Sequence, residues 1–100
     1  MKKLSPAARA AALKKLRGWK GVGGRDAIAR KFAFGDFNAA FAFMTRTALL
    51  ADKMDHHPEW FNVYNKVEVT LATHDAGGVT QNDIDMATAM DGYAKALGGK

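Results

Sequence analysis

Two stretches of the chain alternate apolar and polar side chains with a period of two, which is the pattern of half-buried β-strands. Between residues 27 and 34, Ile28, Arg30, Phe32 and Phe34 fall on one face. Between residues 66 and 73, one face carries Val67, Val69 and Leu71 and the other carries Lys66, Glu68, Thr70, Ala72 and His74. Residues 19–22, before the first of these segments, and 60–64, before the second, are interpreted as two further strands. A Gly-Gly pair at 23–24 predicts a turn that joins the first two strands into a hairpin.

Two other segments have the caps and the apolar spacing of helices. Ser5 followed by Pro6 predicts a helix start, and the alanine-rich sequence then continues to about Arg17, with Leu13 and Leu16 facing inward. The sequence from Thr80 to Asp83 has the form of a capping box. It predicts a last helix that reaches the C-terminal glycines, with Ile84, Ala87, Ala94 and Leu97 as its apolar positions.

Between these segments lies a longer apolar helix, capped by Asp36. It must end near Asp55 or His56, because Pro58 disfavours helical geometry at the residue before it. Its apolar residues recur at helical spacing: Phe37, Ala40, Phe41, Met44 and Ala48, widened by Phe43, Leu50 and Met54. We expect this helix to be the most buried element.

The elements follow the order α-β-β-α-β-β-α. This order predicts the α+β class, with a four-stranded antiparallel sheet and three helices packed on one face. No repeat or linker divides the 100 residues, so we expect a single domain over 1–100.

The composition excludes several kinds of chemistry. Without cysteine, the chain has no disulfide, zinc thiolate site, iron–sulfur cluster or thiol nucleophile. Its one serine, Ser5, serves as a helix cap, which argues against a serine hydrolase. No apolar run approaches the roughly 18–20 residues that cross a bilayer, so we expect a soluble, cytoplasmic protein.

Charge is distributed unevenly along the chain, whose formal net charge is +5. Residues 1–50 contain eleven Lys and Arg against two acidic residues, whereas residues 51–100 contain four against eight. A basic half favours contact with nucleic acid or an acidic protein. Spaced lysines on a helix also form an ordinary solvated face, so both interpretations stay open.

All three histidines lie at the ends of predicted elements. His56 and His57 stand between a helix end and Pro58, and His74 ends a strand just before a Gly-Gly turn. Such positions commonly carry function, and imidazole moves protons near neutral pH. A shared catalytic site is one hypothesis, and separate surface or capping roles are the other.

A metal site is the rival explanation for clustered histidines, and the spacing argues against it. Helical metal sites use histidines four residues apart, whereas adjacent His56 and His57 diverge in an extended chain. A metal would also need His74 and a carboxylate such as Asp52 or Asp83. Because Asp52 lies four residues before His56, its carboxylate either orients that imidazole or forms an exposed pair of little consequence.

The most distinctive residues surround these histidines. They read DKMDHHPEWFNVYNKV at 52–67, LATHD at 71–75 and GVT at 78–80, followed by Asp83. In these motifs the chain closely resembles the pterin-4a-carbinolamine dehydratases, called in animals the dimerisation cofactor of a hepatocyte nuclear factor. The resemblance extends from Trp19 to the last helix.

The resemblance implies a hydro-lyase that removes water from 4a-hydroxytetrahydrobiopterin, the carbinolamine left by aromatic amino-acid hydroxylases, giving quinonoid dihydropterin. It implies neither a metal nor an organic cofactor. By position, His56, His57 and His74 match the family's active-site histidines. We assign His56 and His74 to acid and base work and His57 to binding and orienting the pterin, with the choice of acid and base left open.

The resemblance also implies further site residues. Asp55, Ala72, Thr73 and Asp75 match positions that line the pterin pocket, where backbone groups would read the pyrimidine edge. Three supporting residues are Asp52, where many relatives have glutamate; Trp60, as a flat wall or a core residue; and Asp83, as an acidic position that is also a helix cap. Ala72 stands where relatives often have serine.

For partners, the resemblance implies a homodimer or homotetramer, with an aromatic amino-acid hydroxylase as metabolic partner and no membrane. The alternative is a non-catalytic module, resembling a transcriptional coactivator, that binds protein or nucleic acid through its basic N-terminal half. Sheets that bind RNA display aromatics within a Gly-Phe-rich signature, which residues 60–74 lack. We therefore do not expect a nucleic-acid partner.

Overall fold

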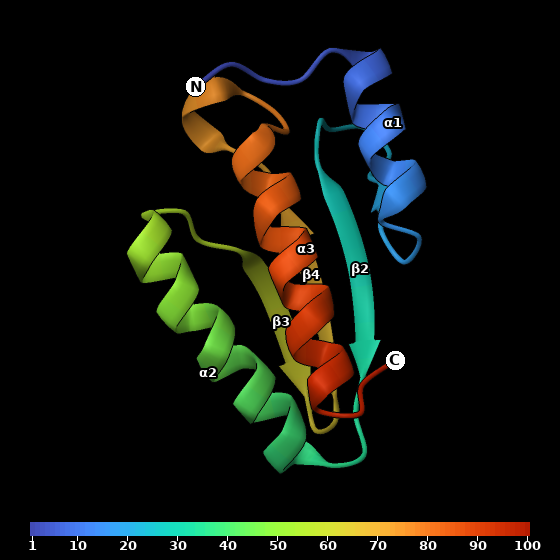
Figure 1. Cartoon of the computed structure of the whole chain (residues 1–100), viewed down its shortest axis with the longest axis vertical. Coiled ribbons are helices and arrows are strands. Elements are labelled where there is room, and N and C mark those ends of the chain that lie inside the picture. The colour runs from blue at the N-terminus through green and yellow to red at the C-terminus, as the bar shows by residue number, and fades with distance from the viewer.

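The computed structural model describes residues 1–100 and has the element order predicted from the sequence, with one short addition. The elements are α1 (Pro6–Lys15), β1 (Lys20–Gly21), β2 (Ile28–Ala33), α2 (Phe37–Met54), β3 (Glu59–Val63), β4 (Lys66–Leu71), the 3₁₀ turn η1 (His74–Ala76) and α3 (Gln81–Ala96). Figure 1 shows α3 in front of the sheet and α2 beside β3, both running roughly along the strands, with α1 at the upper end.

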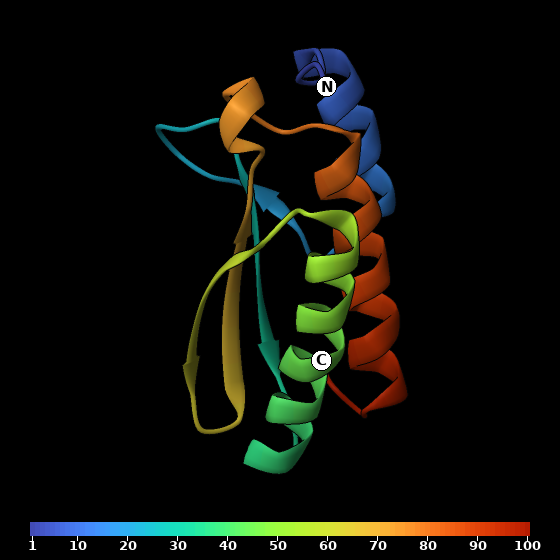
Figure 2. The same cartoon turned by 90° about the vertical axis from the view of Figure 1, so that its left-hand side faces the viewer.

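The four strands form one antiparallel sheet in the order β1-β2-β4-β3. Seen from the side, the three helices lie on one face and leave the other uncovered (Figure 2). As predicted for β4, Val67, Val69 and Leu71 are buried beneath the helices, while Lys66 and Glu68 are exposed. The predicted α+β class and topology are confirmed.

Aromatic side chains hold the helices to the centre of the sheet. Phe43 of α2 packs against Phe32 and Phe34, with ring centroids 4.7 and 5.0 Å apart. For α3, Asp91 accepts hydrogen bonds from the Trp19 indole at 2.8 Å and from Arg30 of β2 at 2.7 Å. These contacts fix α2 and α3 side by side over β2 and β4.

The prediction for the inner face of α2 was right for Ala40 and Phe43 and wrong for Phe37 and Phe41. The buried residues are Ala40, Phe43, Thr47 and Ala51, whereas Phe37 and Phe41 are 47% and 56% exposed. Apolar residues lie around much of this helix, so the spacing is compatible with two different buried faces. In the structure the face centred on Phe43 packs against the sheet. Nor is α2 the most buried element, because the shorter α3 buries five residues against its four. Neither α2 nor any other helix has the length and apolar content needed to span a bilayer.

Two element ends also differ from the prediction. The first helix stops at Lys15, because Leu16 leaves helical geometry and turns its side chain into the core. β4 ends at Leu71, so His74 lies not at a strand end but in η1, inside a short loop closed by pairing of Thr73 with Gly78.

Asp26 joins the N-terminal region to the loop before α3. Its Oδ1 accepts hydrogen bonds from Val79 N at 3.2 Å and from Arg9 Nη1 at 2.6 Å. The Val79 N–H, aided by the Arg9 guanidinium, holds the pKa of Asp26 below its ordinary value.

We expect Asp26→Asn to destabilise the protein at neutral pH but not in acid. A carboxyl whose pKa is lowered by folding adds stability above its unfolded pKa, and this stability is lost as the pH falls through the folded pKa. Urea unfolding should show that the difference in the free energy of unfolding between wild type and variant becomes smaller below about pH 4. A difference that stays constant down to about pH 2 would remove Asp26 from the acid response.

Candidate active site

The three histidines line one cavity of about 450 Å³, although His74 is far from the other two in sequence. This volume falls within the range of about 300–1,000 Å³ typical of small-molecule sites. Its lining residues are Met1, Asp55, His56, His57, Ala72, Thr73, His74, Asp75, Ala76 and Asn82. The residues predicted to be catalytic or substrate-binding all lie among them.

The end of α2 separates the two adjacent rings. Asp55 takes a left-handed conformation (φ 50°), and the His56 N–H returns to the Ala51 carbonyl at 3.0 Å. Pro58 then keeps the chain extended into β3. As a result His56 is buried, with 8% of its side chain exposed, whereas His57 is 59% exposed.

Buried His56 is tied to the start of α3 through Asp83. Its Nε2 lies 2.6 Å from Asp83 Oδ1, and the carboxylate is fully buried. The second oxygen, Oδ2, accepts hydrogen bonds from Thr73 Oγ1 and Thr80 N, both at 2.8 Å. The bond from Thr80 N completes the predicted capping box, so one side chain both caps α3 and contacts a site histidine.

This contact determines which nitrogen of His56 carries the proton. A carboxylate only accepts hydrogen bonds, so the proton must sit on Nε2 for the 2.6 Å contact to Asp83 to be a hydrogen bond. Neutral His56 then keeps its lone pair on Nδ1. Nδ1 is therefore the nitrogen left to accept a proton from a ligand.

Asp52 contacts a different histidine from the one predicted. Its Oδ1 lies 3.0 Å from Nε2 of His57, an exposed contact, while His56 is turned inward to Asp83. The prediction assumed that the helix continues through His56, but the left-handed Asp55 ends it and rotates the next residue away.

His74 reaches the cavity from the loop between β4 and α3. It is exposed, and η1 presents it beside Asp75 and Ala76. Gly77 follows at φ 74°, a conformation that favours glycine, and lets the chain turn back so that Gly78 pairs with Thr73. The closed loop thus holds His74 at the cavity wall.

An exposed ion pair lies next to the segment that carries His57, outside the cavity. Arg25, in the loop between β1 and β2, donates two hydrogen bonds to Glu59 at 2.9 and 2.8 Å. This contact holds the pKa of the Glu59 carboxyl below its usual range and raises the pKa of Arg25. Glu59 begins β3 directly after Pro58, so the pair anchors the segment that carries His57.

Three wall residues were missed from the sequence, and one predicted residue lies elsewhere. Trp60 is partly buried against the core and does not line the cavity, which excludes the flat-wall interpretation. Asn82 lines the cavity, and its place in the capping box was the available signal. Met1 and Ala76 also line it, and Met1 could not be found from local sequence because a tertiary contact brings it there.

Metal binding has no geometric support. No group of three His, Cys, Asp or Glu side chains lies close enough together to hold a metal ion. Within the site, Asp83 and Asp52 are instead each bonded to one imidazole.

Comparisons with known proteins agree closely with one another. The family model described as pterin 4 alpha carbinolamine dehydratase matches residues 2–93. Relatives from Bradyrhizobium sp. (strain ORS 278) and Nitrobacter hamburgensis, both named for pterin-4-alpha-carbinolamine dehydratase, are each 62% identical over 99% and 96% of this chain, and 99% and 95% of their own lengths.

Solved structures give the same result. A protein from Brucella melitensis described as a transcriptional coactivator/pterin dehydratase superposes with a TM-score of 0.92 at 54% identity, covering 93% of this chain and 99% of its own. A pterin dehydratase-like protein described as a RuBisCO assembly factor shares the fold (TM-score 0.67, 23% identity), covering 77% of this chain and 89% of its own. The chain therefore belongs to the pterin 4 alpha carbinolamine dehydratase family.

Proposed function

We propose that this protein dehydrates a 4a-hydroxytetrahydropterin to the quinonoid dihydropterin and water, using its three histidines. The observation that carries this proposal is the shared cavity lined by His56, His57 and His74. In the cell this dehydration would be one step in regenerating the tetrahydropterin used in aromatic amino-acid hydroxylation, because its quinonoid dihydropterin product must still be reduced.

The reaction needs one proton donor and one proton acceptor on a fused ring. The C4a–O bond breaks and the hydroxyl leaves as water only if it is protonated. The N5–H proton is lost to a base, and its electron pair forms the N5–C4a double bond. Each positioned proton transfer typically contributes about 10²–10⁴-fold to the rate.

The hydrogen-bond network supports a division of these roles. His56 offers a lone pair at Nδ1, because Asp83 holds the proton on Nε2, and we assign it as the base for N5–H. Exposed His74 is then the acid that protonates the leaving hydroxyl. His57, held by Asp52, would orient the ring, with Asp55, Ala72, Thr73 and Asp75 around it.

Stopped-flow absorbance tests the proposal. Freshly generated carbinolamine is mixed with the protein or with buffer, and the appearance of quinonoid product is followed. The proposal requires a rate that rises with protein concentration, saturates with substrate and is unchanged by EDTA. A rate equal to that in buffer would reject it, and strong inhibition by EDTA would indicate a metal-dependent reaction instead.

The same assay separates the enzyme from the binding module predicted as the alternative. Duplex DNA or heparin added at low salt would occupy the basic N-terminal half in a module that binds polyanions. Turnover should be unaffected, because the residues that line the histidine cavity come mainly from other parts of the chain. A protein without turnover that binds these polyanions tightly would support the module.

Turnover should fall toward about pH 5, because a protonated base cannot accept the N5 proton, and also toward about pH 8, because a deprotonated acid cannot protonate the leaving hydroxyl. The pH dependence of kcat/KM reports both losses. A rate that stays flat over the whole range would show that no histidine titrates in the rate-limiting step.

We further propose that the chain forms a homodimer or homotetramer. Large apolar side chains are exposed on α2 (Phe41, Leu49) and on the edge strand β3 (Phe61, Val63), and such surfaces are unusual on a monomer. Light scattering at micromolar concentration reports the mass directly, and a monomer mass would contradict the proposal.

A further inference from the structure

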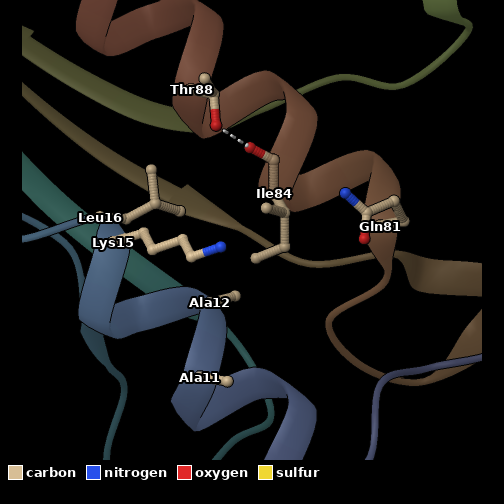
Figure 3. Close-up of a pocket in the computed structure, with 7 residues that line it drawn as sticks. All are labelled: Ala11, Ala12, Lys15, Leu16, Gln81, Ile84 and Thr88. Atoms are coloured by element: carbon tan, nitrogen blue, oxygen red, sulfur yellow. Dashed lines mark hydrogen bonds between the residues drawn. The ribbon is translucent and has the colours of Figure 1, made fainter.

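A second cavity lies between α1 and α3, away from the histidines. It encloses about 440 Å³ and is lined by Ala11, Ala12, Lys15 and Leu16 of the α1 region and by Gln81, Ile84 and Thr88 of α3. Figure 3 shows the Lys15 side chain reaching from α1 toward Ile84 across the opening. We call these seven residues the α1/α3 groove. None of them lines the histidine cavity.

The groove exists because α1 is incompletely packed. None of the ten residues of α1 is fully buried; within the helix Leu13 packs partly buried against the core, and the flanking Leu4 and Leu16 make the other apolar contacts. A ten-residue helix is marginal without tertiary contacts, since most helix stability in proteins comes from packing of an apolar face. Ala11 and Ala12 therefore present methyl groups to a groove that no other element of this chain fills.

The positive charges around the groove are mostly not paired with carboxylates of this chain. Residues 1–25 contain no acidic side chain. Of the seven cationic side chains in residues 1–20, only Arg9 forms a salt bridge, with Asp26. Lys14, Lys15 and Arg17, at the end of α1 beside the groove, are left without a carboxylate partner.

We propose that the α1/α3 groove docks an acidic amphipathic helix of a partner protein. Its apolar residues would pack on Ala11, Ala12 and Ile84, and its carboxylates would pair with Lys15 and the neighbouring cations. Helices bind grooves in this way through apolar residues at i, i+3, i+4 and i+7, and complementary charge sets their orientation.

The lining favours a helix over nucleic acid. Phosphates need only cations, so an apolar floor would add nothing to their binding. Bases would need an aromatic surface on which to stack, and the groove contains no aromatic residue. The combination of a methyl-lined floor and unpaired cations matches a helix that is apolar on one face and acidic on the other.

Fluorescence anisotropy with designed peptides tests the proposal. The probe is a labelled helix of about 18 residues with leucine along one face and glutamate elsewhere. Two controls have the same leucines in shuffled positions, or lysine in place of glutamate, and a third is duplex DNA. The proposal requires saturable binding of the acidic amphipathic peptide and clearly weaker binding of all three controls.

Variants locate the binding. Ala11→Glu and Lys15→Glu change exposed side chains in the groove, and each should weaken binding by about tenfold or more. The matched control is Lys66→Glu, the same charge change on the uncovered face of the sheet, which should alter binding by less than about twofold. Turnover should be unchanged in all three variants, since none lies in the histidine cavity.

Three results would overturn the proposal. One is no saturable binding of the acidic peptide. Another is equal binding of the shuffled peptide, because the apolar stripe would then be irrelevant. The third is tighter binding of duplex DNA together with equal losses in Lys15→Glu and Lys66→Glu, which would indicate non-specific attraction to the positive charge of the whole protein.

Discussion

His74→Ala should slow dehydration by about 10²–10⁴-fold, the range of one positioned proton transfer. His74 is exposed in η1 and makes no side-chain hydrogen bond within the protein, so its removal takes the acid from the cavity and little else. The free energy of unfolding should change by less than about 0.5 kcal/mol, as for surface substitutions in general.

Two measurements check this expectation together. Stopped-flow turnover gives kcat, and urea unfolding confirms that the variant is folded. The matched control is Lys95→Ala, which removes an exposed side chain from the last turn of α3. This variant should retain wild-type turnover. Wild-type kcat in a folded His74→Ala protein would remove this residue from the mechanism.

Asp83→Asn should lower kcat by a similar factor through a different route. The asparagine has only one acceptor oxygen, and we expect this oxygen to accept the hydrogen bonds from Thr73 Oγ1 and Thr80 N that Asp83 Oδ2 accepts in the wild type. Its amide would then donate to His56 Nε2, which reverses the tautomer and moves the ring proton to Nδ1. Nδ1 would then carry a proton and could no longer accept the proton from N5–H.

The effect of Asp83→Asn must be distinguished from simple unfolding. Asp83→Ala would leave a buried imidazole and two donors unpaired, and each buried donor without a partner costs about 1–3 kcal/mol of stability. The asparagine keeps most of these hydrogen bonds and should cost much less. The ring nitrogen shifts of His56 report the tautomer, and Asp85→Asn, an acidic side chain hydrogen-bonded to Gln81 on the same helix, is the control. Normal kcat with a reversed tautomer would reject His56 as the base.

Much of the fold could be predicted because local signals agreed with the tertiary structure. Ser5, Asp36 and Thr80 each cap the helix that they were predicted to cap, and the alternation in β4 identified its buried face. The face of α2 could not be predicted, since apolar residues surround this helix and only contact with Phe32 and Phe34 selects Phe43.

The site shows the same division between local and tertiary information. The motif from Asp52 to Val67 identified the histidine pair, but the left-handed turn at Asp55 decided that His56 meets Asp83 and that Asp52 meets His57. Asp83 also accepts a hydrogen bond from Thr80 N, as the predicted capping box requires. The spacing did not reveal that Thr73 and His56 reach the same carboxylate.

The ion pair between Arg25 and Glu59 is a stabilising contact that could not be predicted from the sequence. They are separated by 34 positions, and neither stands out by composition or spacing. The strand register brings them together, because Ala29 near the start of β2 and Glu59 at the start of β3 both pair with Thr70 of β4. Their two hydrogen bonds then steady the segment that carries His57, outside the cavity itself.

The central claim is that three imidazoles surround one bicyclic ligand, and NMR tests it most directly. The chain has only three histidines, so three Cε1–H signals can be followed while a stable pterin is titrated in, with His74→Ala identifying one of them. All three signals should shift along one binding curve with one Kd. Shifts confined to a single ring, or rings that respond with different Kd values, would contradict a common site.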